Sequence, residues 1–133
     1  QKVKSKNEIY LSNLIKYKGI ISPEEIEKVY LKSNCLMLQI SDFLPLSMVI
    51  PSKVFEYAYS FLPIIYSADG FTDNFIKKIN GTIKYKQSDS KEFVNSILES
   101  KKISVNKLER EKALKKYKSQ DIYSRYANYI INY

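Results

Sequence analysis

The chain has 133 residues, and its 22 lysine and arginine residues outnumber its 14 aspartate and glutamate residues, which gives a net charge of +8. This length suits one domain with a real core, and we predict a single domain over residues 1–133. The sequence contains no histidine and only one cysteine, Cys35, which excludes histidine-dependent triads, histidine metal sites and internal disulfides.

The positive charge raises the question of a nucleic-acid partner. Arg110 and Arg125 are the only arginines, and lysine lacks the planar fork that reads base edges or clamps a phosphate. We therefore expect no nucleic-acid partner and interpret most lysines as a solvated surface. Peripheral contact with an anionic membrane fits the lysines better, because each lysine near anionic lipid contributes about 1 kcal/mol without needing a fixed geometry.

The first predicted elements are a strand, a helix and a second strand. Residues 17–21 are predicted to be the end of a strand, and Ser22-Pro23-Glu24-Glu25 combines an N-cap, a first-position proline and a capping-box glutamate. The continuous apolar run over residues 35–40 predicts a strand buried on both faces of a parallel sheet. Residues 41–50 follow the carboxyl end of that strand, which is where ligands collect in open parallel sheets.

The segment that begins at Pro51 predicts a helix whose start binds an anion. Pro51 suits the first helical position, so that the N–H groups of Ser52 and Lys53 can point at a phosphate. Glu56 lies about one turn further on, where a carboxylate can accept hydrogen bonds from sugar hydroxyls. A phosphate site beside such a carboxylate predicts a bound nucleotide. Two alternatives stay open: Glu56 is simply a solvated helix residue or a partner of Lys53, three residues earlier, and Ser52 is only a polar residue of the first turn.

The remaining elements complete an α/β fold. A strand is predicted over residues 62–67, and Gly70, in the loop that follows, is a candidate for close backbone approach to the ligand. Residues 82–86 alternate between apolar and polar side chains, as is typical of an edge strand. Helices are predicted around residues 75–79, from residue 89 or 90, and over the lysine-rich segment that follows. We predict a Rossmann-like parallel sheet of about four strands, with helices on both faces and a helical C-terminus. A final tyrosine-rich stripe is either a docking surface or part of the core; its residues are Ile122, Tyr126, Ile130 and Tyr133.

The stretch Pro51-Ser52-Lys53-Val54-Phe55-Glu56-Tyr57-Ala58, continued by Pro63-Ile64-Ile65, resembles the nucleotide-sugar half of family 4 glycosyltransferases with the GT-B fold. The order of elements from residue 17 to residue 81 is similar as well. The resemblance implies a retaining, metal-independent transferase that uses a nucleotide-diphosphate-sugar as donor substrate and needs no cofactor. It places Glu56, Ser52, Lys53 and Pro51 at the nucleotide, and Gly19 and Ile20 near its base, although a glycine that ends a strand can also mark only a tight turn.

Two positions depart from the family pattern. Met48 stands where the family commonly has a first glutamate near the donor sugar, which affects sugar identity and activity unless the loss is a subfamily trait. Phe61 stands where a glycine usually ends the helix in a left-handed conformation, so either the helix ends differently or packing holds Phe61 in place.

The resemblance also sets the wider expectations. We expect the acceptor domain and the first strands of the donor domain to be absent, so that this part alone binds but does not turn over. The acceptor, a sugar or a lipid-linked group, would be held by that missing N-terminal domain. The expected setting is cytoplasmic, with peripheral contact at the inner face of the membrane, in surface polysaccharide or glycolipid synthesis. The alternative is a non-catalytic interaction module that docks a protein or an anionic membrane.

Overall fold

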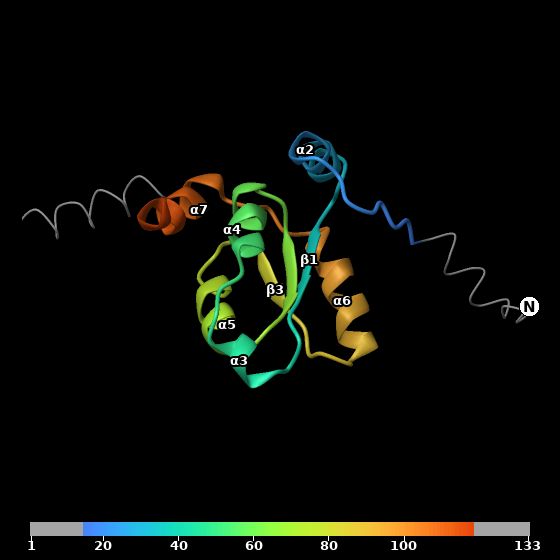
Figure 1. Ribbon diagram of the computed structural model, residues 1–133, viewed down its shortest axis with the longest axis vertical. Helices are drawn as coiled ribbons and strands as arrows, with labels where there is room; N and C mark the ends of the chain where they lie inside the picture. Colours follow the sequence, from blue (N-terminus) through green and yellow to red (C-terminus); the bar gives the residue numbers. More distant parts are fainter. Residues whose placement is uncertain (1–14, 119–133) are drawn as a thin grey trace, which may run out of the picture. The chain divides into compact units, whose positions relative to one another are not determined.

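A computed structural model describes residues 15–118 of the chain, which divides into two units, residues 1–31 and residues 32–133 (Figure 1). The described part of the first unit contains one helix, α2 (Pro23–Leu31). Its predicted capping box is confirmed, because the Ser22 N–H donates to Glu25 Oε2 at 3.1 Å and the Glu25 N–H donates to Ser22 Oγ at 3.3 Å. The hydrogen bond from Ser22 lowers the pKa of the neighbouring Glu24 carboxyl.

The strand predicted over residues 17–21 is wrong. A β-strand is defined by its hydrogen bonds to a neighbouring strand. None of the strand pairs among the described residues includes this segment. Tyr17 and Ile20 are exposed, and Gly19 has a φ of +68°, as in a turn.

The second unit is built on a parallel sheet of three strands, where four were expected. The strands are β1 (Leu36–Gln39), β2 (Ile64–Ser67) and β3 (Thr82–Lys84), in the order β1-β2-β3. The register aligns Leu36 with Ile64 and Ile64 with Thr82. Only the central strand β2 is buried along its whole length. The prediction that residues 35–40 are buried on both faces is half right, because Met37 on β1 is 43% exposed.

Helices cover both faces of this sheet, as predicted. Helices α4 (Ser52–Tyr59) and α5 (Gly70–Ile76) connect successive strands and lie on one face, while α6 (Ser90–Ser100) lies on the other (Figure 1). The short helix α3 (Leu44–Ser47) interrupts the loop between β1 and α4. After α6 the chain continues into α7 (Lys107–Leu114) and a single 3₁₀ turn, η1 (Lys115–Tyr117). Within residues 15–118, no helix combines the length and the apolar composition needed to cross a bilayer.

The main core lies between the sheet and the helices α4, α5 and α7. Val54 and Ala58 are four residues apart, so they share one face of α4, and both are buried. Leu114 brings α7 into the same cluster with no exposed surface. The other buried members are Leu38, Ile64, Tyr66, Ala68, Phe75, Ile76 and Ile79.

Helix α7 is fixed by a buried arginine. Arg110 has no exposed surface, and its guanidinium donates to the carbonyl oxygens of Asn80 at 2.6 Å, Ala58 at 3.3 Å and Gly81 at 3.3 Å. Burial lowers the pKa of Arg110 to about 10, so the side chain is still charged at neutral pH. It joins the end of α4 to the turn that precedes β3.

Phe61 adopts the left-handed conformation that favours glycine, with a φ of +57°. It follows Ser60, which caps the C-terminus of α4. The helix therefore ends as the family pattern predicts, but with a residue that pays roughly 1–2 kcal/mol for this conformation. The Lys107 ammonium lies 5.4 Å from the centre of the Phe61 ring, and this contact from α7 helps to hold the ring. The tyrosine-rich stripe predicted over residues 122–133 lies outside the described residues.

Candidate functional site

Two adjoining cavities lie at the carboxyl edge of the sheet, where β1, β2 and β3 all end. The smaller cavity, of about 310 Å³, lies between the loop after β1 and the loop after β2. The larger, of about 510 Å³, extends to the segment after β3. The residues that line both are Asp42, Ser67, Asp69 and Gln87. The prediction that ligand contacts belong in the loop over residues 41–50 agrees with this position, because Ser41, Asp42 and Ser47 line the smaller cavity.

The two cavities differ in charge. The lining of the smaller cavity includes the carboxylates of Asp42 and Asp69 and no cation. Such a lining suits hydroxyl groups, which donate hydrogen bonds to carboxylates. The larger cavity shares both carboxylates and adds that of Glu92, but it also adds Lys84 and Lys86, which can balance the charge of a phosphate.

An ion-pair network connects residues that line the larger cavity to helix α5. The Lys84 ammonium lies 2.9 Å from Asp69 Oδ1 and 3.2 Å from Asp73 Oδ1, and the Tyr66 hydroxyl donates to the same Asp73 oxygen at 3.0 Å. The hydrogen bond to Asp69 raises the pKa of Lys84. Burial, and then Asp73, raises the pKa of Tyr66. At neutral pH Lys84 is thus a cation and Tyr66 a neutral donor.

Gly70 lies in the smaller cavity at the start of α5, with a φ of +65°. A Cβ atom at this position would lie 2.2 Å from the carbonyl oxygen of Ser47. The close backbone approach that the sequence predicted at Gly70 is therefore to α3. Gly70 helps to shape the cavity because α3 packs directly against it.

The residues predicted at the start of α4 lie elsewhere. Pro51 precedes the helix, with φ −61° and ψ 145°, so its placement at the first helical position is wrong by one residue. Its carbonyl oxygen accepts the Val54 N–H at 3.0 Å, and Ser52, the first residue of α4, is exposed. None of Pro51, Ser52, Lys53 or Glu56 lines either cavity.

Glu56 forms an ion pair with Lys53 at 2.6 Å, and both side chains are about two-fifths exposed, at 43% and 42%. The alternative that paired these two residues at three-residue spacing is the one observed. An exposed pair of this kind contributes little to stability, so its cost of opening to a ligand is small. Gly19 and Ile20 belong to the first unit, where Gly19 has a positive φ and Ile20 is exposed.

Sequence reasoning missed the charged residues of the carboxyl edge, namely Asp42, Asp69, Asp73, Lys84 and Lys86. One signal could have found most of them, because Asp42, Asp69 and Lys86 lie two or three residues beyond the ends of the strands. Asp73 is different: it meets Tyr66 and Lys84 only because α5 starts beside the end of β2. Within residues 15–118, no group of three histidine, cysteine, aspartate or glutamate side chains is arranged to hold a metal ion.

Comparison of the chain with protein-family models, with curated proteins and with solved structures finds no match. The resemblance to family 4 glycosyltransferases therefore rests on residues 51–65 and on the order of elements from α2 onward, because the strand expected before α2 is not observed. The fold itself, a parallel sheet with helices on both faces, is of the Rossmann-like α/β class.

Proposed function

We propose that this chain supplies the nucleotide-sugar-binding part of a retaining, metal-independent glycosyltransferase. The observation that carries the proposal is the pair of adjoining cavities at the carboxyl edge of a parallel sheet, whose shared carboxylates Asp42 and Asp69 are joined in the larger cavity by Lys84 and Lys86. Open α/β sheets bind their ligands at this edge. The segment over residues 51–65 adds the reaction class by its resemblance.

Each part of the donor has a chemically suitable partner in this proposal. Lys84 and Lys86 face the diphosphate, and Asp42 and Asp69 accept hydrogen bonds from hydroxyls of the donor sugar. Cations placed against the diphosphate stabilise the charge that develops as it departs, which is the main catalytic contribution available here.

Helix α4 contributes the nucleotide contact in this proposal. Glu56 accepts hydroxyl hydrogen bonds from the nucleotide, and the ammonium of Lys53, 2.6 Å away in the unbound chain, turns to a phosphate. Ser52 lies at the start of the same helix, where N–H groups favour an anion. The acceptor, a sugar or lipid-linked group, is held by another domain, in the cytoplasmic synthesis of surface polysaccharide or glycolipid.

A thermal-shift titration with UDP, GDP and their sugar conjugates tests the proposal. Ligand at 100 times its Kd adds about 2.7 kcal/mol to the free energy of unfolding, which raises the melting temperature by several degrees. We expect one nucleotide series to produce this rise, and Glu56→Gln to remove most of it. Glu99→Gln is the matched control, because Glu99 is exposed on α6 and should leave the rise unchanged.

The remaining outcomes separate the alternatives. A rise that survives Glu56→Gln but is lost in Lys84→Gln would remove α4 from the site and keep the cavities. If no nucleotide stabilises the folded chain, the donor-site proposal is wrong, and the interaction-module alternative gains support.

A further inference from the structure

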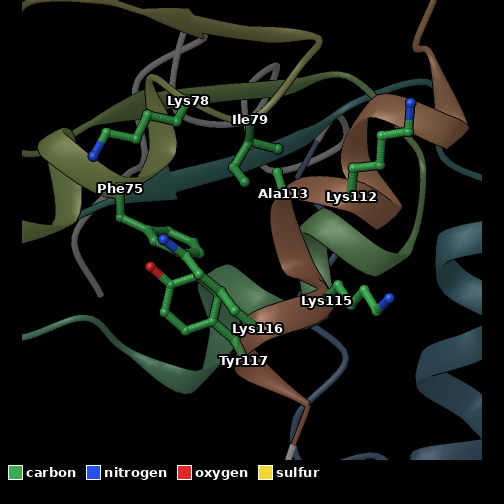
Figure 2. Close-up of a pocket in the computed structure, with 8 residues that line it drawn as sticks. All are labelled: Phe75, Lys78, Ile79, Lys112, Ala113, Lys115, Lys116 and Tyr117. Carbon is green, nitrogen blue, oxygen red and sulfur yellow. The ribbon is translucent and has the colours of Figure 1, made fainter. Parts of the chain in front are cut away.

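A third cavity, of about 570 Å³, lies between the end of α5 and the segment formed by α7 and η1 (Figure 2). We call it the lysine groove. It shares no lining residue with the two cavities of the carboxyl edge. It therefore calls for a separate explanation.

The groove is surrounded by positive charge. Its lining contains four exposed lysines and no carboxylate; the lysines are Lys78, Lys112, Lys115 and Lys116. Figure 2 shows the side chains of Lys78, Lys112 and Lys115 pointing outward, whereas that of Lys116 lies over the Tyr117 ring. Within residues 15–118, no ion pair joins Lys78, Lys112 or Lys115 to a carboxylate. An anion that entered the groove would meet the ammonium groups of these three lysines, which no described carboxylate neutralises.

The floor of the groove is apolar but mostly covered. Phe75 and Ile79 are buried, and Ala113 and Tyr117 are partly buried. The rings of Phe75 and Tyr117 meet edge to face, with centroids 4.9 Å apart, and the Lys116 ammonium lies 5.1 Å from the centre of the Tyr117 ring. The aromatic faces are thus already occupied, and the exposed residues of the lining are the four lysines.

We propose that the lysine groove binds an anionic phospholipid at a membrane surface. The phosphate lies among the ammonium groups, and the glycerol region rests on the aliphatic stems of the lysines. Lysines near anionic lipid act as point charges and need no fixed geometry.

The same features argue against two other anionic partners. Single-stranded RNA binds by stacking its bases on open aromatic faces, and Phe75 and Tyr117 are packed on each other with Lys116 over the tyrosine. An acidic amphipathic helix needs a groove with several open apolar anchor points, whereas two of the four apolar residues here are buried.

Co-sedimentation of the full chain with lipid vesicles tests the proposal. The probes are vesicles of phosphatidylcholine alone and of phosphatidylcholine mixed with phosphatidylglycerol, at low and at physiological salt. We expect binding only to the anionic vesicles, with weaker binding at the higher salt. The triple substitution Lys78→Gln, Lys112→Gln and Lys115→Gln should weaken this binding on the order of 100-fold. Lys116 is left unchanged because it packs on Tyr117.

A second triple substitution controls for net charge. Lys91, Lys101 and Lys102 are exposed on α6 or directly after it, and α6 covers the opposite face of the sheet (Figure 1). Changing these three residues to glutamine removes the same charge, and we expect less than about a fivefold effect, because α6 covers the face of the sheet opposite α4 and α5. Melting temperatures of both variants near that of the wild type confirm that each is folded.

Three results would overturn the proposal. Equal losses in the two triple variants would show that net charge alone attracts the chain. Equal binding to neutral and anionic vesicles, or no vesicle binding at low salt, would exclude a site for anionic lipid. An oligouridylate that binds the wild type more tightly than the vesicles do, and that the groove substitutions weaken, would assign the groove to nucleic acid. The nucleotide titration described above is independent of all three.

Discussion

The sheet has a cation at each end of its strands: one at the amino edge, where the strands begin, and one at the carboxyl edge, where they end. The two cations are held in opposite ways. At the amino edge, Arg110 is fully buried and donates only to main-chain carbonyl oxygens. At the carboxyl edge, Lys84 is exposed and bridges two carboxylates beside open cavities. Arg110 has no room for a ligand and serves to hold α4, α7 and the turn before β3 together. Lys84 can exchange a carboxylate for a phosphate at little cost, because an exposed ion pair contributes little to stability.

The comparison predicts that changes at the amino edge alter stability and that changes at the carboxyl edge alter binding. Arg110→Ala has the largest expected effect on stability. It removes a donor from the buried carbonyl oxygen of Ala58 and from the part-buried ones of Asn80 and Gly81, the last of which keeps the Ile64 N–H, and it opens a cavity, so we expect a loss of about 3 kcal/mol in the free energy of unfolding. Urea denaturation measures the loss.

The control for Arg110→Ala is Lys112→Ala, an exposed position on the same helix, where the change should stay within about 0.5 kcal/mol. Nucleotide affinity per folded molecule should be unchanged in both variants. A small effect of Arg110→Ala on stability would show that the hydrogen bonds from α7 contribute little to holding the amino edge of the sheet together.

Gly70→Ala has the next largest effect and acts at the carboxyl edge. The new Cβ would lie 2.2 Å from the Ser47 carbonyl oxygen, on a backbone with φ +65°. We expect a loss of about 2 kcal/mol from strain and displacement of α3, together with a weaker response to nucleotide.

Gly19→Ala provides a matched control for that contact. Gly19 has a similar φ of +68°, but nothing lies within 4 Å of a Cβ atom built there. It should therefore show only the cost of the left-handed backbone, about 1 kcal/mol. Equal losses of stability in the two variants would mean that the contact with Ser47 does not contribute to the effect of Gly70→Ala.

Tyr66→Phe has the smallest expected effect, with a clear dependence on pH. It removes the hydrogen bond to Asp73 and should cost about 1 kcal/mol at neutral pH. Folding raises the pKa of Tyr66 above the value of about 10 expected in the unfolded chain. This contribution to stability is therefore complete below about pH 10 and is lost as pH rises toward the folded pKa.

Urea denaturation between about pH 8 and pH 11 measures this difference. The wild type should lose stability more steeply at the alkaline end than Tyr66→Phe. Tyr59→Phe, at an exposed position on α4, should follow the wild type. Parallel curves for wild type and Tyr66→Phe would show that ionisation of Tyr66 is not coupled to folding.

Much of the fold could be predicted from local patterns. The capping box at Ser22 and Glu25 fixed the start of α2, and Asp89 caps α6 by accepting the Lys91 and Glu92 N–H groups, each at 3.0 Å. These features involve neighbours along the chain. The strand over residues 17–21 was wrong because a strand also requires a partner, and apolar residues near a glycine do not reveal one.

The location of the candidate site could be predicted from the sequence, but most of the residues that form it could not. The loop after β1 was expected to carry ligand contacts because of the rule for parallel sheets. The pairing of Lys84 with Asp69 and Asp73 depends on the alignment of Tyr66 beside Lys84 in the sheet, which no local pattern encodes. The role of Glu56 in nucleotide binding stays a prediction.

The hydrogen bonds of the buried Arg110 also have a consequence for the order of folding. Its partner Ala58 lies 52 residues earlier in the chain, and Asn80 and Gly81 lie 30 and 29 residues earlier. Contacts between residues so far apart in sequence form late and slow the folding reaction. During synthesis, β1, α4 and β2 leave the ribosome well before α7, so their shared core stays open on one side until Arg110 and Leu114 emerge. Of the described helices, α7 is thus the last to add its contacts to this core.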